Sequence, residues 1–360
     1  MSGTWGNNIK ISIFGESHGN AIGINIDGLD PGIELDLSEI YTEMSRRSPG
    51  KSHLSSIRKE SDMPDIVSGY FEGKTTGTPL CAIINNEDKK SKDYSKIKDL
   101  ARPGHADYTG YIKYNSFNDY RGGGHFSGRL TAPLVFCGAI CKQILKRKGI
   151  FIGSHIKKIN SVEDVSFDFT NITKKELDEL KNLELPLIDI TKKEEMQKVI
   201  TEARISSDSV GGIVECAAIG IKPGIGDPFF DSVESVLSHL MFSIPAVKGV
   251  EFGVVFGVAD MLGSECNDEF YINKKVIKTK TNNNGGILGG ITNGMPLVFK
   301  VAIKPTPSIA KTQNTVNFKD NTNEKISIEG RHDPCIVQRA LPVIEAVAAI
   351  GIYDLFKGSR

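Results

Sequence analysis

The 360-residue chain lacks an excess of charge of either sign, long hydrophobic runs and closely spaced cysteines. Lys plus Arg and Asp plus Glu both number 44, so no net field draws the chain to nucleic acid or to an anionic membrane. No apolar run reaches about 18 residues, and the N-terminal residues lack a basic stretch followed by an apolar core. We therefore expect a cytoplasmic protein with no membrane contact and no nucleic-acid partner.

Cysteine is scarce, whereas glycine is in excess. The six cysteines are too few for a disulfide framework, and none has the C-x2-C spacing of structural zinc sites. We expect reduced, buried thiols and no metal site. The 37 glycines make up roughly 10% of the chain, against a usual share of about 7%. Several backbone positions are therefore expected to need positive φ or a close approach to a ligand.

Hydrophobic periodicity predicts strands and helices that alternate within one domain over residues 1–360. The expected strands cover residues 9–14, 21–27, 67–71, 79–84, 212–219 and 247–255, and the expected helices cover residues 36–47, 130–148, 193–204, 232–242 and 335–356. Asp36 is the expected N-cap of the first helix, and Asp333 with Pro334 is expected to begin the last. Residues 159–195 are rich in Asp, Lys, Asn and Glu, which favours a variable surface excursion.

One short pattern occurs twice. The pattern T-x-G-x-P-L followed by apolar residues stands at residues 75–80 and again at residues 292–297. Six positions are too few to establish a duplication. If the repeat is real, it predicts two similar halves packed into one body rather than two separable domains.

Three histidines stand in turns that also contain glycine. They are His18 in G-E-S-H-G, His105 in R-P-G-H-A-D and His332 in G-R-H-D-P. Histidine can give or take a proton near neutral pH, and a glycine neighbour lets a ligand approach it. A single histidine of this kind is more often an ordinary loop residue, but three in one chain favour an acid/base site.

Arginine is concentrated in or beside the same turns. A guanidinium group matches the oxygens of carboxylate and phosphate, although any one of these arginines could serve a surface ion pair instead. Taken together they favour a ligand with several negative charges. The set comprises Arg46, Arg47, Arg102, Arg121, Arg129 and Arg331.

Glycines combined with hydroxyl side chains form a third signal, in residues 121–128 and in residues 285–290, which lead to residues 304–308. Backbone N–H groups exposed by glycine can hold phosphate, and Ser127 precedes a predicted helix N-terminus. Neither stretch is a Walker A loop or a dinucleotide-binding loop, and plain glycine-rich hairpins remain the alternative. The residues alone therefore indicate a polyanionic ligand and acid/base groups, and do not identify the reaction.

Seven blocks in order give the chain a close resemblance to the chorismate synthase family over nearly its whole length. They are GESHG, RPGHADYTG, DYRGGGHFSGR, AVKGVEFG, GGILGGITNG, KPTPSI and GRHDPC. The resemblance implies an α+β fold with a β-α-β sandwich core, assembled as a homotetramer. It implies a lyase that converts 5-enolpyruvylshikimate 3-phosphate to chorismate and phosphate by 1,4-anti elimination with reduced FMN (FMNH2). This reaction is the last step of the shikimate pathway towards aromatic amino acids.

The resemblance also implies roles for individual residues. His18 corresponds to a histidine that protonates the departing phosphate, and His105 to one that keeps the reduced flavin correctly protonated. Ser127 and Asp333 correspond to residues that relay a proton to or from flavin N5. The implied substrate-binding residues are Ser17, Arg46, Arg47, Arg102, Arg129 and Arg331. The implied flavin-binding residues are His125, Phe126, Ser127, Ala246, Gly289, Lys304, Pro305, Thr306, Pro307, Ser308 and Arg331, and Arg47 and His53 are related to NADP.

The chain differs from many family members at three places. His125 and Phe126 replace Arg and Ser, Pro245 replaces Asn, and His53 replaces an Arg found in some members. A flavin phosphate contact at position 125 and a nicotinamide contact at position 53 therefore stay open. The chain shows no obvious reductase domain, which favours a separate flavin reductase over reduction of the flavin by this chain with NADPH.

Two other functions are compatible with parts of the sequence. A catalytically silent flavin-binding paralogue would keep the fold, but loss of His18, His105 or Asp333 would be its sign, and all three are present. A phosphate-transferring histidine enzyme would explain residues 331–332 beside an acidic residue. It would leave the glycine-rich segments unexplained.

Overall fold

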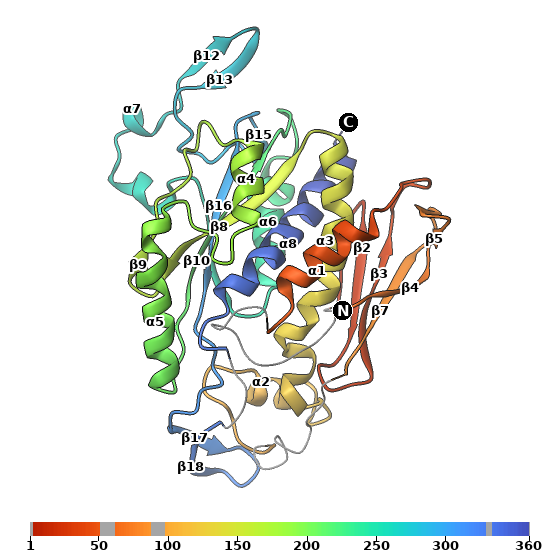
Figure 1. The fold of residues 1–360 in the computed structure, drawn as a ribbon, viewed down its shortest axis with the longest axis vertical. Coiled ribbons are helices and arrows are strands. Elements are labelled where there is room, and N and C mark those ends of the chain that lie inside the picture. The colour runs from red at the N-terminus through yellow and green to blue at the C-terminus, as the bar shows by residue number, and fades with distance from the viewer. Residues whose placement is uncertain (1–2, 51–61, 88–97, 329–332, 360) are drawn as a thin grey trace.

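Two antiparallel five-stranded sheets enclose a layer of helices in the computed structural model, which describes residues 3–50, 62–87, 98–328 and 333–359 (Figure 1). The first sheet has the order β1 (Thr4–Trp5), β2 (Lys10–Gly15), β3 (Ala21–Asp27), β7 (Leu80–Asn85) and β4 (Asp65–Ser68). The second has the order β11 (Val247–Phe252), β16 (Leu297–Ile303), β10 (Gly212–Ile219), β8 (Phe151–Ile159) and β9 (Val162–Glu163). The predicted α+β fold with a β-α-β sandwich is confirmed.

Four helices form the middle layer: α1 (Leu37–Arg47), α3 (Thr131–Arg147), α6 (Val233–Phe242) and α8 (Val337–Gly358). Helix α3 packs on β3 and β7 of the first sheet, and α8 packs on β8 and β10 of the second. Helices α3 and α8 also pack along each other, which explains why both are apolar around most of their circumference. Gly138 permits this contact, because a Cβ there would lie 2.3 Å from the Cβ of Ala346.

The remaining elements are short and connect or cover the layers. They are β5 (Tyr70–Phe71), β6 (Lys74–Thr75), α2 (Asp107–Lys113), α4 (Lys174–Lys181), α5 (Lys193–Ile205), α7 (Gly263–Cys266), β12 (Phe270–Asn273), β13 (Val276–Thr279), β14 (Ile287–Leu288), β15 (Ile291–Thr292), β17 (Gln313–Asn317) and β18 (Thr322–Ile326). Short 3-10 segments are η2 (Arg121–Phe126), η3 (Gly128–Leu130), η4 (Ile190–Lys192), η5 (Phe229–Asp231) and η6 (Val255–Asp260). Among the described residues, no helix is both long and apolar enough to cross a membrane.

The two halves of the chain have the same topology. In the first sheet the strands β2, β3, β7 and β4 lie side by side, and in the second the strands β8, β10, β16 and β11 do so. When these four strands of each half are numbered in chain order, the fourth lies between the second and the third in both halves. A helix follows the second strand in each half, α1 in one and α6 in the other. This shared order supports the predicted repeat.

The repeated T-x-G-x-P-L pattern has the same hydrogen bonds in both halves. Thr75 Oγ1 donates to the carbonyl of Asp30 and accepts from the amide of Ile33. Thr292 makes the same two bonds within residues 222–225, and all four distances lie between 2.7 and 3.0 Å. The short pattern thus marks one turn, built twice.

The beginning of the last helix differs from the prediction. Asp36 caps α1 as predicted, since its Oδ1 accepts from the amide of Glu39 at 3.1 Å. Helix α8, however, begins at Val337 rather than at residue 335, so the prediction that Asp333 and Pro334 form its cap and first turn is wrong. The carbonyl of Pro334 instead accepts from the amide of Val210, which keeps this stretch extended.

Residues 159–195 are a packed layer rather than a surface excursion. They form β9, α4 and η4 and bury four apolar side chains against Ala217 and Val298 of the second sheet; these side chains are Phe167, Ile172, Leu177 and Leu180. The neighbouring Cys216 and Phe299 belong to the main core on the helical face. Because successive side chains of a strand point to opposite faces, residues 159–195 cover the outer face of this sheet.

Candidate active site

Two of the three histidine turns meet at the glycine run of η2, near α2 at the lower end of Figure 1. Gly122, Gly123 and Gly124 have φ angles of 59°, 86° and 53°, a region that side chains disfavour. A Cβ on Gly122 would lie 2.1 Å from the ring of His18, and a Cβ on Gly123 would lie 3.0 Å from Nε2 of His105. The glycines thus allow the close approach of two imidazole rings.

His18 is buried and is held by the turn that follows β2. Its Nδ1 lies 3.1 Å from the hydroxyl of Ser17, which also lies 3.1 Å from the carbonyl of Gly122. The amide of Ser17 donates to the carbonyl of Gly124. The G-E-S-H-G turn is therefore fixed to the glycine run by both backbone and side chain.

His105 shares its Nδ1 with two charged partners. Nδ1 lies 3.0 Å from Oδ1 of Asp107 and 3.1 Å from Nη2 of Arg102. Arg102 also donates to both oxygens of Asp107, from Nη2 at 2.6 Å and from Nε at 2.7 Å. Burial alone raises the pKa of Asp107, but the hydrogen bonds from Arg102 and His105 outweigh it and hold that pKa well below its usual value. Asp107 is therefore a permanent anion beside His105.

Residues 304–308, which follow β16, join the same turn. Lys304 donates from Nζ to the carbonyl of Gly104 at 2.5 Å and from its amide to the carbonyl of Ala246 at 2.9 Å. Ala246 has a φ of 75°, which is uncommon for a residue with a side chain. Thr306 Oγ1 is buried and has no hydrogen-bond partner among the described residues. An oxygen in this state marks a place where a further polar group would be accommodated.

Arg47 and Arg129 converge on the buried carboxylate of Asp62. Arg47 donates to it from Nε at 3.1 Å and from Nη2 at 2.5 Å, and Arg129 binds its other oxygen. Arg129 also donates from Nε to Oδ1 of Asn86 at 3.0 Å. The two cations are thereby held next to each other, which their mutual repulsion would otherwise oppose.

Asp333 is tied to this cluster through Arg339. Arg339 donates from Nη1 to Asp333 at 2.5 Å and from Nε to the carbonyl of Arg47 at 3.0 Å. Arg47 in turn donates to the carbonyl of Gly128 at 3.5 Å, one residue beyond Ser127. Ser127 Oγ accepts from the amide of Arg129 at 3.3 Å. One continuous set of contacts therefore connects Asp333 with Ser127.

Comparison with known proteins identifies the family. A family profile described as chorismate synthase matches residues 9–356. The chain belongs to the chorismate synthase family. It is similar to chorismate synthase from Thermococcus kodakarensis, with 45% identity over 346 residues, which cover 96% of this chain and 95% of the relative. It is also similar to chorismate synthase from Methanocaldococcus jannaschii, with 46% identity over 367 residues, which cover 99% and 96%.

A solved structure agrees with these relatives. A crystal structure of chorismate synthase superimposes with a TM-score of 0.77 at 30% identity and covers 98% of this chain and 92% of its own. The resemblance read from the seven motif blocks is confirmed. The protein is an enzyme of this family, a lyase that forms chorismate.

Not every predicted site residue faces the two histidines. Arg46 lies in a buried ion cluster between helices, where it donates to both oxygens of Glu345 at 2.7 and 3.0 Å and to Glu43 at 2.9 Å. Burial alone raises the pKa of Glu345, but the charges of Arg46 and Lys142 lower it to about 2. The guanidinium of Arg46 is thus already matched by carboxylates.

Gly289 lies at the opposite end of the second sheet from Lys304. It forms the turn between β14 and β15, before β16 begins, whereas Lys304 follows the end of β16 (Figure 1). Seven residues of extended strand separate these ends by about 20 Å. Within this chain, Gly289 and residues 304–308 therefore do not meet.

Two of the residues at which the sequence departs from the family, His125 and Phe126, have local contacts. His125 donates from Nδ1 to the carbonyl of Gly15 at 2.9 Å and so ties η2 to β2. Phe126 packs beside Gly110 and 6.2 Å from the ring of Tyr114. Both side chains thus help to hold the glycine run in place. The predicted residues Arg331 and His53 lie outside the described residues.

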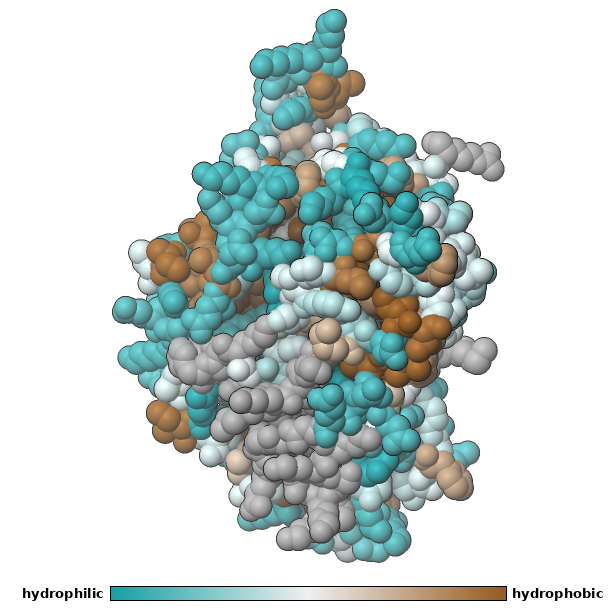
Figure 2. Space-filling model, turned by 45° about the vertical axis from the view of Figure 1, so that its right-hand side comes forward, coloured by the Kyte–Doolittle hydropathy of each residue, from teal (hydrophilic) through white to brown (hydrophobic). Residues whose placement is uncertain are grey.

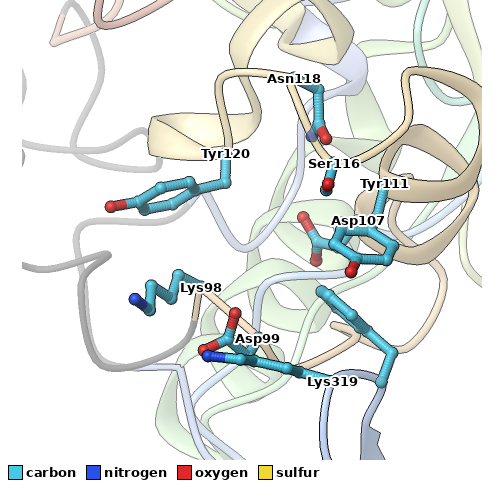
Figure 3. A pocket seen from close by; sticks show the side chains of 9 residues that line it. Lys98, Asp99, Asp107, Tyr111, Ser116, Asn118, Tyr120 and Lys319 are labelled. Atoms are coloured by element: carbon cyan, nitrogen blue, oxygen red, sulfur yellow. The ribbon is translucent and has the colours of Figure 1, made fainter.

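A cavity of about 330 Å³ adjoins the His105 turn. Asp107 and Tyr111 form one side of it, and Lys98, Asp99 and Lys319 lie opposite, as Figure 3 shows. Asp107 therefore stands between this cavity and His105. The rest of the lining consists of Ser116, Asn118, Tyr120 and Phe318.

Sequence reasoning missed Asp62 and Arg339 and gave Asp107 no role. Asp62 is 15 and 67 positions from its two arginines, and no periodicity relates such positions. Asp107 did carry a signal, because it stands two residues after His105 within a turn. Its significance depends on the side-chain directions, which only the folded turn defines.

Proposed function

We propose that this enzyme converts 5-enolpyruvylshikimate 3-phosphate to chorismate and phosphate by 1,4-anti elimination with reduced FMN. In this role it completes the shikimate pathway towards aromatic amino acids. The observation that carries the proposal is the meeting of His18 and His105 on adjacent glycines, next to paired arginines. Imidazole rings suit proton transfer and guanidinium groups suit anion binding, so their proximity supports the proposal.

The arginines suit the charge of the proposed substrate, which carries two carboxylates and one phosphate. Arg47, Arg102 and Arg129 are all buried at the site, where a guanidinium interacts with an anion more strongly than it does in water. Arg331 would join them by the family resemblance. We assign Arg46 to the ion cluster around Glu345 instead, because its guanidinium donates to Glu43 and Glu345 within the helical layer rather than to a residue of the histidine turns.

We assign the proton transfers to the groups that the glycine run gathers. His18 would donate a proton to a phosphate oxygen as the C–O bond breaks, and Ser17 would orient its ring through Nδ1. His105 would hold the cofactor's protonation state from its Nε2 side. Ser127 and Asp333 would move the proton that leaves the substrate ring, with Asp333 kept in place by Arg339.

The residues beside His105 fit a flavin mononucleotide. The buried Thr306 hydroxyl is a vacant hydrogen-bonding group for a phosphate or ring atom, and Lys304 supplies a cation in the same segment. We propose that residues 304–308, Ala246, Ser127 and Arg331 hold the cofactor. When bound, reduced FMN would supply electron density to the substrate during the elimination. The protein's own part is to bind, orient and exclude water.

An anaerobic assay tests the proposal. Purified enzyme is mixed with 5-enolpyruvylshikimate 3-phosphate and chemically reduced FMN, and chorismate absorbance and phosphate are followed together. We expect equal amounts of both products. His18→Ala and His105→Ala should each lower kcat by at least about 100-fold, whereas His239→Ala, an exposed residue of α6, should not.

Other outcomes of this assay would decide against the proposal. Flavin binding without either product would favour a catalytically silent paralogue, and phosphate without chorismate would favour a phosphatase. Repeating the assay with oxidised FMN and NADPH tests the reductant. We propose a monofunctional enzyme that depends on a separate flavin reductase, so this mixture should yield no chorismate; product formation would show that the chain uses NADPH itself.

We further propose that the enzyme is a homotetramer. Large apolar side chains are exposed on the hairpin of β12 and β13, which projects from the body of the molecule (Figure 1), and Figure 2 shows apolar side chains among polar ones at its tip. Exposed apolar surface of this kind is typical of protein interfaces. Sedimentation equilibrium should give four times the chain mass of 39.2 kDa. A monomer at micromolar concentration would contradict this assembly.

A further inference from the structure

We propose that Asp107 is a positioning residue that holds the His105 imidazole with its proton on Nδ1 and with Nε2 bare towards the glycine run. The inference rests on the proposed function, because it refines the part that His105 plays there. It assigns to the carboxylate a task distinct from binding either substrate or cofactor.

Two groups, Asp107 and Arg102, compete for the same ring nitrogen of His105. A neutral imidazole carries a single N–H, so Nδ1 either donates to Oδ1 of Asp107 at 3.0 Å or accepts from Nη2 of Arg102 at 3.1 Å. The carboxylate can only accept, and the guanidinium can only donate. The position of one proton therefore depends on which contact is made.

The distances among the three groups favour Asp107. Nη2 of Arg102 lies 2.6 Å from Oδ1, so the three atoms form a nearly equilateral triangle. Seen from Nη2, the two acceptors are separated by roughly 60°, whereas the two N–H bonds of a planar guanidinium nitrogen diverge by roughly 120°. A hydrogen that points at Oδ1 therefore does not point at Nδ1. A carboxylate oxygen, in contrast, accepts from both directions.

Arg102 also keeps Asp107 charged and in place. It donates to Asp107 from its amide, Nε and Nη2, so that both carboxylate oxygens are held in a bidentate pair. The side chains of Arg102 and Asp107 are 5% and 12% exposed. A fixed, ionised carboxylate is the partner that favours an Nδ1–H imidazole, as in other histidines that act in proton transfer.

Nε2 is therefore the unprotonated ring nitrogen of His105, which can take part in proton transfer. It lies 3.0 Å from the position that a Cβ on Gly123 would take, and that position is 3.9 Å from Cβ of Ser127. In the described part of the chain, Lys304 is a further charged group near this turn, where it binds the carbonyl of Gly104. Lys98 and Lys319 lie across the cavity on the far side of Asp107 (Figure 3). None of these lysines can accept the Nδ1 proton while it is charged.

The test observes the tautomer directly. Full-length enzyme labelled with 15N-histidine is examined by long-range 1H–15N correlation, which distinguishes Nδ1–H from Nε2–H, and His105→Gln identifies the signals. We expect wild-type His105 to be the Nδ1–H form. Asp107→Asn should convert it wholly or partly to the Nε2–H form, because the asparagine amide can donate to a bare Nδ1. Wild-type His105 with its proton on Nε2 overturns the proposal, whether or not the enzyme forms chorismate.

Kinetics then separate positioning from a merely structural role. Asp107→Asn should lower kcat by about 100-fold with KM changed less than about threefold, since a misplaced tautomer affects the chemical step rather than binding. Asp107→Glu should recover part of the loss. Tyr111→Phe alters the same cavity without touching His105 and should retain wild-type kcat. A normal kcat in Asp107→Asn, or a loss found only in KM, contradicts the positioning role.

Discussion

At the scale of single residues, the charged groups of this enzyme act in buried sets rather than as separate pairs. Asp62 binds Arg47 and Arg129 together, and Asp107 binds Arg102 and His105 together. In each set one carboxylate keeps two cationic or ionisable groups in a fixed geometry. Removing such a carboxylate should therefore cost more than losing one surface ion pair.

Asp62→Asn tests this at the arginine pair. The change leaves two buried guanidinium groups with one anion fewer, and we expect the free energy of unfolding to fall by on the order of 3 kcal/mol. Urea denaturation measures it. Asp178→Asn removes an exposed partner of Lys174 and should cost under about 0.5 kcal/mol. Equal costs for the two variants would show that Asp62 contributes no more than a surface pair.

We expect a second buried set, around His155, to make the stability depend on pH. His155 is fully buried between Asp164, 3.1 Å from Nδ1, and Glu215, 2.9 Å from Nε2. Burial alone lowers the pKa of His155, but these two carboxylates outweigh it and raise that pKa above its ordinary value. Folding therefore favours the protonated ring. The stabilisation is complete below the unfolded pKa of about 6.5 and is lost as pH rises through the higher folded pKa.

We accordingly expect the free energy of unfolding to decrease as pH is raised above about 6.5. Urea titrations at a series of pH values measure this slope. In His155→Gln the part of the slope due to this group should vanish, while His239→Gln, on the exposed side of α6, should keep it. A wild-type slope that survives in His155→Gln would assign the pH dependence to other groups.

At the scale of elements, the sequence predicted the helices and strands whose formation depends on residues close to one another in the chain. The helix at residues 36–47 and the strand at residues 212–219 follow from a side-chain cap and from apolar periodicity, and both are found. Residues 159–195 were misread because polar residues dominate their composition. Their few apolar side chains, such as Leu177 and Leu180, are spaced to cover a sheet that lies elsewhere in the sequence. Long-range contacts of this kind have no local signature.

The same limit applies to the candidate site. The histidine turns and the glycine run could be predicted, because proton-transfer groups beside glycine are visible in the sequence itself. The position of Arg46 could not be predicted, because Glu345, which accepts its hydrogen bonds, is 299 residues away in the chain. The sequence also could not predict that Gly122 and Gly123 make room for imidazole rings, because this depends on how two distant turns pack.

The packing of α3 against α8 yields a prediction for Gly138. A Cβ at this position would lie 2.3 Å from that of Ala346, so the helices would have to separate. Alanine is the better helix former by up to about 1 kcal/mol, but overpacking a core costs about 1–3 kcal/mol. We expect Gly138→Ala to lower the melting temperature. Gly263→Ala, with open space around it, should not, and a gain in both variants would show that the helix contact is loose.

At the scale of the whole molecule, the two halves enclose one helical layer and share one turn design. The active site is not repeated, because its residues come from connections that differ between the halves. The glycine run lies between β7 and α3 in the first half, and residues 304–308 lie between β16 and α8 in the second; the two connections are equivalent in position but differ in sequence. The duplication thus supplies a symmetric scaffold, and function depends on the parts that depart from the symmetry.

The shared turn design leads to a matched pair of predictions. Thr75 and Thr292 are both buried, and each hydroxyl satisfies one backbone amide and one backbone carbonyl. Valine has nearly the same shape but leaves both groups without that partner, at a cost of about 1–3 kcal/mol. We expect Thr75→Val and Thr292→Val to destabilise the enzyme to a similar extent, and the double variant to show the sum, because the two turns belong to different halves of the chain and bind different backbone groups.

Thr201→Val, on the exposed side of α5, is the control and should change stability by less than about 0.5 kcal/mol. Urea unfolding of the four variants gives the comparison. If the halves fold as one cooperative body, each single substitution lowers the stability of the whole, and one transition is seen throughout. Two separate transitions, or a cost confined to one of the two threonines, would mean that the halves carry unequal shares of the fold despite their common topology.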